Sequence, residues 1–177
     1  GHDMFHVQRV YQMALQLASF YEVDNEVVAL ASILHDLDDP KISENTHFVS
    51  RFLSSADLDS GKKTMIQDII NNMSFSKQKE GAMIECLEGK IVQDADRLDA
   101  IGAIGIARCF AYGGAKHRAI YLGDNDDSSS LAHFYQKLLK LEDLMNLEES
   151  RMIAHERTKL MKEFLTHFHE DFNLGVI

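Results

Sequence analysis

The sequence predicts an all-α protein, a compact single-domain helical bundle. Proline occurs only once in 177 residues, so long helices meet few residues that would break them. Apolar side chains recur at three- and four-residue intervals along most of the chain, which is the spacing of one helix face. Hydrophobic residues make up 45% of the chain, which is enough to build one buried core. We therefore predict one domain over residues 1–177.

Two helices are predicted at the start of the chain. Apolar residues at helical spacing over residues 7–21 indicate the first helix, and His6 begins it. The second helix can be capped by Asp24 or Asn25, because short polar side chains accept the unpaired N–H groups of a first turn. Its apolar core runs directly into His35, and the helix is expected to halt before the only proline.

The same spacing predicts the remaining helices. A long central helix is expected to end at Gly113-Gly114, and its internal glycines are expected to allow close helix packing. The polar stretch Tyr121–Ser130 is a candidate active-site loop. The predicted helices are Phe48–Leu53, Met65–Met73 after a Ser60 cap, Glu88–Tyr112, Leu131–Leu144 and Leu147–Phe172.

The composition argues against several classes of partner. The formal net charge is −10, whereas binding to polymeric DNA or RNA needs clustered Lys and Arg side chains. A small phosphate ester remains compatible, because one metal ion and a few local cations can hold it. No apolar run is long enough to cross a bilayer and none resembles a signal peptide, so we place the protein in the cytoplasm, without a membrane partner. Cys86 and Cys109 are expected to be reduced thiols.

The end of the second predicted helix carries an unusual group of acidic residues. Asp36, Asp38 and Asp39 follow His35 directly, although carboxylates are disfavoured at the negative end of a helix dipole. A bound cation would relieve that repulsion. The alternative is a solvated polar loop, but a His-Asp pair that closes a buried apolar run needs a partner. His6 and Asp96 lie on other helices that should reach the same core.

Three motifs in this order carry a resemblance to a known family. They are His-x-x-Arg-Val from His6, Leu-His-Asp ending at Asp36, and Asp-Ala-Asp-Arg-Leu-Asp-Ala-Ile-Gly around Asp96. The chain thereby resembles the HD-domain superfamily of metal-dependent phosphohydrolases, which are helical bundles. The resemblance implies that His6, His35, Asp36 and Asp96 are the metal ligands. Only His47 lies between the His-Asp pair and the last Asp, so a centre with one metal ion is expected.

The resemblance extends through Tyr-Gly-Gly-Ala-Lys at 112–116 and His-Phe-Tyr-Gln-Lys-Leu-Leu-Lys-Leu at 133–141. It is closest to the YpgQ-like branch of small bacterial proteins, which implies a nucleotide pyrophosphohydrolase. Such an enzyme cleaves a nucleoside triphosphate, including deoxy forms, to monophosphate and pyrophosphate. The alternatives are a nucleoside monophosphate phosphomonoesterase, an enzyme for cyclic nucleotides or a guanosine alarmone, and a non-catalytic HD-like nucleotide-binding or regulatory module. A homodimer is left open. The segment over 121–130 is shorter than in relatives.

A mixed nitrogen and oxygen site suits one divalent ion, with Mn²⁺ favoured over Mg²⁺, Fe²⁺, Co²⁺, Ni²⁺ or Zn²⁺. Asp39 or Asp38 could accept a proton from the attacking water or orient it, although a plain helix stop explains both residues as well. Arg97, Lys116 and Lys137 are candidates to bind substrate phosphates, and Arg97 directly follows a predicted ligand. The alternative for each of these cations is a solvated surface charge.

Overall fold

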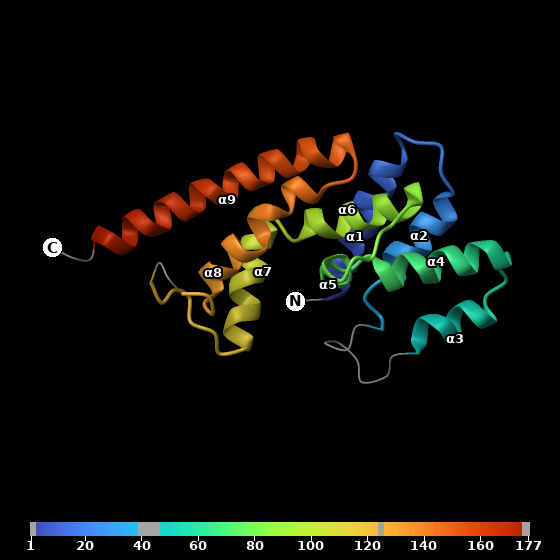
Figure 1. Ribbon diagram of the computed structural model, residues 1–177, viewed down its shortest axis with the longest axis horizontal. Helices are drawn as coiled ribbons and strands as arrows, with labels where there is room; N and C mark the ends of the chain where they lie inside the picture. Colours follow the sequence, from blue (N-terminus) through green and yellow to red (C-terminus); the bar gives the residue numbers. More distant parts are fainter. Residues whose placement is uncertain (1–2, 39–46, 124–125, 175–177) are drawn as a thin grey trace. The chain divides into compact units, whose positions relative to one another are not determined.

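The computed structural model describes residues 3–38, 47–123 and 126–174, and every regular element in these ranges is helical (Figure 1). The all-α prediction is therefore confirmed. The helices are α1 (Met4–Ala18), α2 (Asn25–Leu34), α3 (Phe48–Ser55), α4 (Ser60–Asn72), α5 (Phe75–Lys79), α6 (Leu87–Asp99), α7 (Gly102–Ala115), α8 (Ser130–Gln136) and α9 (Glu148–Leu174), with 3₁₀ turns η1 (Leu138–Lys140) and η2 (Glu142–Leu144). The chain divides into two compact units, residues 2–96 and 97–177. The single-domain prediction stays a prediction.

Both predicted N-terminal helices are present, and each begins after an aspartate cap. The Asp3 carboxylate accepts the His6 N–H of α1 at 2.8 Å. The Asp24 carboxylate accepts two N–H groups of the first turn of α2, at 3.0 and 3.3 Å. α1 packs against α2, so the two helices share one core. Its buried apolar residues are Val10, Ala14, Leu17, Ala18, Val27, Val28, Ala31 and Leu34.

The next helices of this unit differ from expectation in one cap and in one added element. The predicted Ser60 cap is wrong, because Asp59 caps α4 and accepts N–H groups of the first turn at 2.7 and 3.3 Å. A carboxylate also interacts favourably with the helix dipole, which a serine hydroxyl does less well. The short helix α5 was not predicted, since five residues cannot show a helical period.

The predicted long helix Glu88–Tyr112 is wrong, because the chain breaks between α6 and α7. Gly102 has φ +75, a left-handed backbone conformation that ends helical propagation and strongly favours glycine. An ideal Cβ at Gly105 would lie 2.3 Å from the Ala100 carbonyl oxygen, so this glycine lets α7 start against the end of α6. The Arg108 guanidinium ties the two helices together by donating to the Asp99 carboxylate. The glycines therefore serve a bend. Gly102 also allows the close helix packing that the sequence predicted, because an ideal Cβ there would lie 3.0 Å from the Arg157 side chain of α9.

The predicted stop at Gly113-Gly114 is also wrong, because α7 continues to Ala115. The left-handed turn that follows is made by His117, with φ 53. Gly113 is needed for another reason: an ideal Cβ there would lie 2.1 Å from the Ser130 hydroxyl oxygen. This glycine allows α7 to approach the start of α8 closely.

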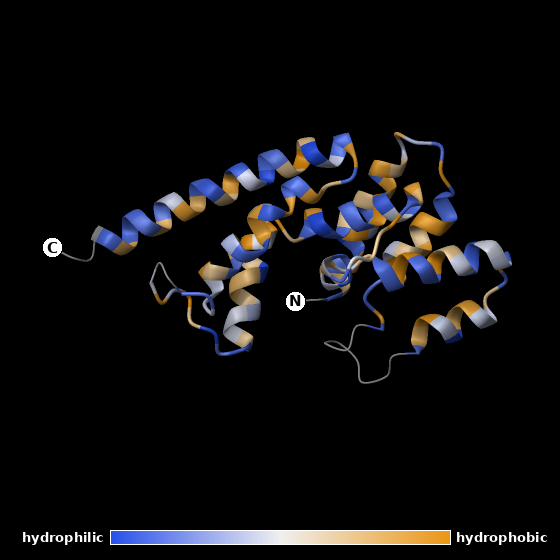
Figure 2. Ribbon diagram, in the orientation of Figure 1, coloured by the Kyte–Doolittle hydropathy of each residue, from blue (hydrophilic) through white to orange (hydrophobic). Residues whose placement is uncertain are grey.

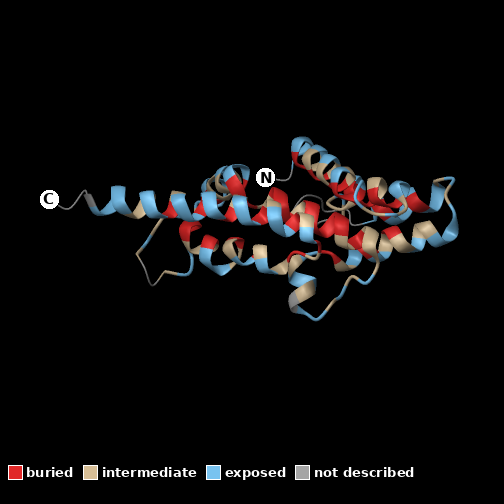
Figure 3. Cartoon of the chain, turned by 90° about the horizontal axis from the view of Figure 1, so that it is seen from above, coloured by how far each residue is buried: buried red, intermediate tan, exposed pale blue. Residues whose placement is uncertain are grey.

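Of the two helices predicted in the last third of the chain, one is interrupted and the other is present. The predicted helix Leu131–Leu144 is wrong beyond Gln136, where the chain forms two 3₁₀ turns. Leu138 in the first turn and Leu141 between the two turns are buried. The predicted helix Leu147–Phe172 is confirmed as α9, along which hydrophobic residues recur at helical intervals (Figure 2). Leu165 is the last buried residue of α9, and the turns that follow are mostly exposed, with Phe168 and His169 half-buried (Figure 3).

Two further expectations concern the whole chain. Within the described ranges, no helix combines the length and apolarity that crossing a membrane would require. Cys86 and Cys109 are both free thiols, as predicted.

Candidate metal centre

His6 is held in the first turn of α1 by the cap that starts this helix. Its backbone N–H donates to the Asp3 carboxylate at 2.8 Å, so the turn that carries the imidazole is fixed. The His6 side chain is fully buried, with an exposed fraction of 0%. A buried imidazole needs a polar partner, and His6 finds its partners on α2 and α6.

His35 lies at the C-terminal end of α2, and a backbone hydrogen bond sets its tautomer. Its Nδ1 lies 2.8 Å from the Ser32 carbonyl oxygen. Because a carbonyl only accepts, Nδ1 carries the hydrogen, and the neutral ring presents the lone pair of Nε2. That Nε2 lies 3.3 Å from the Nε2 of His6, and the two rings meet edge to face. Orienting an imidazole through its second nitrogen is the usual way to prepare it as a metal ligand.

Two carboxylates face the pair of imidazoles. One Asp36 carboxylate oxygen lies 3.1 Å from His6 Nε2 and 3.4 Å from His35 Nε2. One Asp96 oxygen lies 3.6 and 3.8 Å from the same two nitrogens. The Asp36 side chain is 14% exposed and the Asp96 side chain 36%, so the group opens to solvent on the side of Asp96.

The chemistry of these four donors fits a divalent cation. Nitrogen lone pairs and carboxylate oxygens all seek positive charge, so their convergence in a largely buried place is unfavourable unless a proton or a metal lies among them. Neighbouring ligands at about 2.1 Å from a shared octahedral ion would be about 3 Å apart, close to the observed spacings. The donor atoms of His6, His35 and Asp96 also all lie within 4.8 Å of one another. These residues could therefore hold one metal ion.

Comparison with known proteins identifies this arrangement. The model of the HD domain matches residues 4–101, which contain all four donors. The chain belongs to the HD-domain family. The chain is 39% identical to the Bacillus subtilis protein YpgQ over 176 residues, and the match covers 97% of this chain and 84% of YpgQ. The resemblance that the sequence motifs predicted is thereby confirmed.

Solved structures agree with this assignment to the HD family. A Lactobacillus plantarum protein has a TM-score of 0.88 at 35% identity, covering 98% of this chain and 88% of that one. YpgQ in complex with ADP has a TM-score of 0.83 at 35% identity, covering 97% and 87%. An HD-superfamily hydrolase from Bacillus thuringiensis has a TM-score of 0.78 at 41% identity, also covering 97% and 87%.

Two acidic residues, Asp38 and Asp39, follow the HD pair, and the structure describes only Asp38. The Asp38 carboxylate accepts the Phe48 N–H at 2.8 Å and the Val49 N–H at 3.2 Å, so it caps the start of α3. These two hydrogen bonds connect the start of α3 to the segment that carries His35 and Asp36. Sequence reasoning missed this cap, because it links residues ten and eleven positions apart. Asp39 lies outside the described residues.

The predicted phosphate-binding cations all belong to the unit of residues 97–177. The Arg97 side chain is buried, at 5% exposure, and its guanidinium donates to the Leu144 carbonyl. The Lys116 ammonium lies 5.9 Å from the centre of the Tyr112 ring. Lys137 is half-buried at the end of α8. Contact of any of the three cations with substrate stays a prediction.

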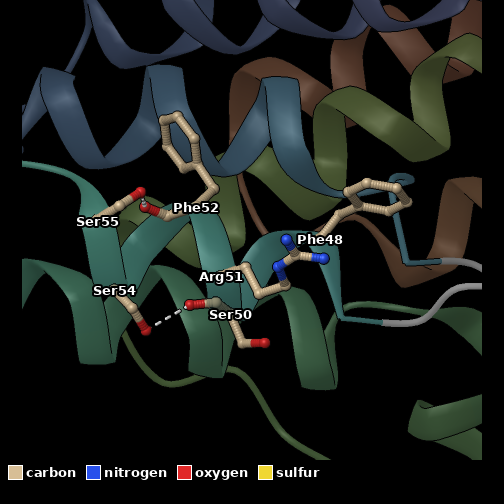
Figure 4. Close-up of a pocket in the computed structure, with 6 residues that line it drawn as sticks. All are labelled: Phe48, Ser50, Arg51, Phe52, Ser54 and Ser55. Carbon is tan, nitrogen blue, oxygen red and sulfur yellow. Dashed lines mark hydrogen bonds between the residues drawn. The ribbon is translucent and has the colours of Figure 1, made fainter.

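A hollow beside α3 holds none of the predicted site residues (Figure 4). Phe48 and Phe52 are 46% and 44% exposed and lie one turn apart there. The described residues that line it are Phe48, Ser50, Arg51, Phe52, Ser54 and Ser55. With no carboxylate or imidazole among these residues, the hollow offers no metal ligands.

Proposed function

We propose that the chain is a metal-dependent phosphohydrolase that cleaves nucleoside triphosphates, including deoxy forms, to monophosphate and pyrophosphate. The observation that carries the proposal is the HD centre, where two imidazole nitrogens lie 3.1–3.8 Å from two carboxylate oxygens. The similarity to a protein described as an HD-superfamily hydrolase supports the reaction class. The similarity to YpgQ, solved with ADP, supports a nucleotide as the ligand.

His6, His35, Asp36 and Asp96 would hold the ion. Two imidazoles and two carboxylates suit borderline and hard divalent metals, so we favour Mn²⁺, with Mg²⁺, Fe²⁺, Co²⁺, Ni²⁺ or Zn²⁺ as alternatives. When bound, such an ion supplies a Lewis acid for a phosphate oxygen and lowers the pKa of water. The neutral imidazoles leave the net charge of the centre to the two carboxylates, which would balance a divalent ion.

The other residues of the chain would position substrate and move protons. Asp39 or Asp38 would accept the proton of the attacking water. The two N–H bonds that the Asp38 carboxylate already accepts favour Asp39 for this role. Lys116, Lys137 and Arg97 would contact phosphate oxygens, where charge grows on the leaving pyrophosphate. For Arg97 this requires donors beyond the one that binds the Leu144 carbonyl.

The position of water attack tests this reaction. Incubation with Mn²⁺ and a nucleoside triphosphate in ¹⁸O-labelled water should place the label on the monophosphate, because attack at the α-phosphorus expels pyrophosphate. An Asp36→Ala variant should form neither product. Diphosphate and orthophosphate as products would refute the assignment. Orthophosphate released only from monophosphates would establish the phosphomonoesterase alternative, and no product from any nucleotide would favour a binding module.

A further inference from the structure

The short helix α3 exposes two aromatic side chains that its own packing does not use. Val49 and Leu53 are buried, at 0% and 4% exposure, and they anchor α3, which packs against α4. Phe48 and Phe52 each lie one residue earlier and remain 46% and 44% exposed. The exposed parts of these two rings add nothing to the core. Adjacent exposed aromatic groups of this kind indicate a surface that binds a ligand.

Both rings line the hollow beside α3. Phe48 and Phe52 are four residues apart in a helix, and their rings extend from the same side of it (Figure 4). The hollow has a volume of about 700 Å³, which is within the range of pockets that hold small molecules. A planar aromatic ligand would cover the exposed ring faces and remove apolar surface from water.

One cationic side chain, Arg51, lines the same hollow. No carboxylate of the described residues lies within ion-pair distance of its guanidinium. The hydroxyl groups of Ser50, Ser54 and Ser55, which also line the hollow, all donate to backbone carbonyls of α3 and its cap, at 2.7–3.2 Å. Among these described residues, the side-chain donors left for a ligand are therefore those of Arg51. A guanidinium can both stack on a planar ligand and donate to acceptor atoms at its edge.

Hydrogen bonds connect this side of α3 to the HD centre within the unit of residues 2–96. The Asp38 carboxylate accepts the Phe48 N–H at 2.8 Å and the Val49 N–H at 3.2 Å. Asp38 follows Asp36 by two residues, so chain geometry keeps the Phe48 nitrogen within roughly 14 Å of the Asp36 Cα atom. A second connection runs through α4, which packs against both α2 and α3. The hollow therefore lies on an element that is fixed near the metal donors.

We propose that Phe48, Phe52 and Arg51 form the subsite for the nucleobase of the substrate. The proposal rests on the proposed function, in which the α-phosphate of a nucleotide meets the ion of the HD centre. Only a ribose separates that phosphate from the base, so the base stays within reach of α3. Aromatic faces stack on every base, and the Arg51 guanidinium adds donors for ring acceptors. The subsite should therefore accept several bases instead of selecting one.

Calorimetry with two ligands that resist hydrolysis measures the contribution of the base. With Mn²⁺ present, α,β-methylene adenosine diphosphate carries a base and a ribose, whereas methylenediphosphonate presents the same phosphorus groups without them. Phe48→Ala should weaken binding of the nucleotide by about 5- to 100-fold, the size expected for stacking of one base. The same variant should leave the affinity for methylenediphosphonate unchanged, because that ligand has nothing to stack.

Further variants separate a binding role from a merely structural one. Phe48→Tyr keeps an aromatic face and should bind the nucleotide within about threefold of wild type. Phe20→Ala is the matched control, because it removes another exposed phenylalanine, at 60% exposure, from the same unit. It should change neither affinity. Arg51→Gln should weaken nucleotide binding by about tenfold, the size expected for a hydrogen bond from a charged donor.

These binding measurements do not depend on cleavage, so the two proposals can fail separately. Equal nucleotide affinity in folded Phe48→Ala and Phe20→Ala would overturn the base subsite, and so would an equal loss for both ligands in Phe48→Ala. The expected loss for the nucleotide alone, in a chain whose wild type cleaves no nucleotide, would support the subsite and refute the proposed function. A wild-type dimer in sedimentation that Phe48→Ala dissociates, with nucleotide affinity unchanged, would overturn the subsite and assign the hollow to a second copy of the chain.

Discussion

The HD centre and the close approach of α7 to α8 are built by different means. The donors of the HD centre lie at the start of α1, the end of α2 and within α6, so regular helices place them. The approach of α7 to α8 depends on a left-handed residue, His117, in the turn after α7, and on a glycine, Gly113, which lets α7 approach Ser130. The comparison shows that short motifs on regular helices can predict which side chains converge. A close approach of two helices that a turn creates becomes visible only in the structure.

The largest effect is expected from removal of a metal donor. Asp96→Ala should reduce kcat/KM by at least about 100-fold, because metal-ion catalysis supplies several kcal/mol. Steady-state kinetics with Mn²⁺ measures this. Asp68→Ala, which removes an exposed carboxylate from α4 in the same unit, is the matched control and should retain activity. Equal activity in the two variants would remove Asp96 from the catalytic centre.

A side chain at Gly113 should destabilise the packing of α7 against α8 without affecting the HD centre. Gly113→Val should lower the free energy of unfolding by about 1–3 kcal/mol, since its Cβ would collide with the Ser130 hydroxyl. Gly114→Ala is the matched control, because an ideal Cβ at Gly114 has no atom within 4 Å and alanine favours the helix. Urea unfolding measures both. Metal content should stay at the wild-type value in Gly113→Val, and its loss would show that the two regions depend on each other.

Two of the aspartate caps in the unit of residues 2–96 should separate stability from catalysis. Asp38→Ala and Asp59→Ala should each lower the free energy of unfolding by about 1 kcal/mol, because each carboxylate accepts two backbone N–H groups. Asp59→Ala should keep its activity. Asp38→Ala should lose less than about tenfold in kcat if Asp39 is the proton acceptor. A loss of about 100-fold or more would assign that role to Asp38.

The smallest effect is a dependence of stability on pH. The Lys62 ammonium donates to the Asp24 carboxylate at 2.9 Å, and this bond, with the N–H groups of α2, lowers the pKa of Asp24. The stabilisation is therefore present above the ordinary aspartate pKa of about 3.9 and is lost as pH falls through the lowered value. Asp24→Asn keeps a good helix cap and removes the charge. Its urea midpoint should lie below wild type at neutral pH, and the difference should shrink below about pH 4. A difference that stays constant with pH would assign it to the cap.

The same contrast explains what sequence reasoning could predict. The convergence of His6, His35 and Asp36 could be predicted, because His6 lies at the start of a helix with an apolar face and an apolar run ends at the HD pair. The break before Gly102 was not, since a glycine within a helical pattern fits either close packing or a bend. The 3₁₀ turns after α8 were missed because their apolar spacing also suits a continuous helix.

A Mn²⁺ titration followed by electron paramagnetic resonance tests the central claim most directly, because it counts free and bound ions. Convergence of His6, His35, Asp36 and Asp96 predicts one tightly bound Mn²⁺ per wild-type chain. At the same concentrations Asp36→Ala should bind none, while the exposed-charge variant Asp68→Ala should match wild type. One Mn²⁺ bound with undiminished affinity in folded Asp36→Ala would contradict the HD centre as the metal site.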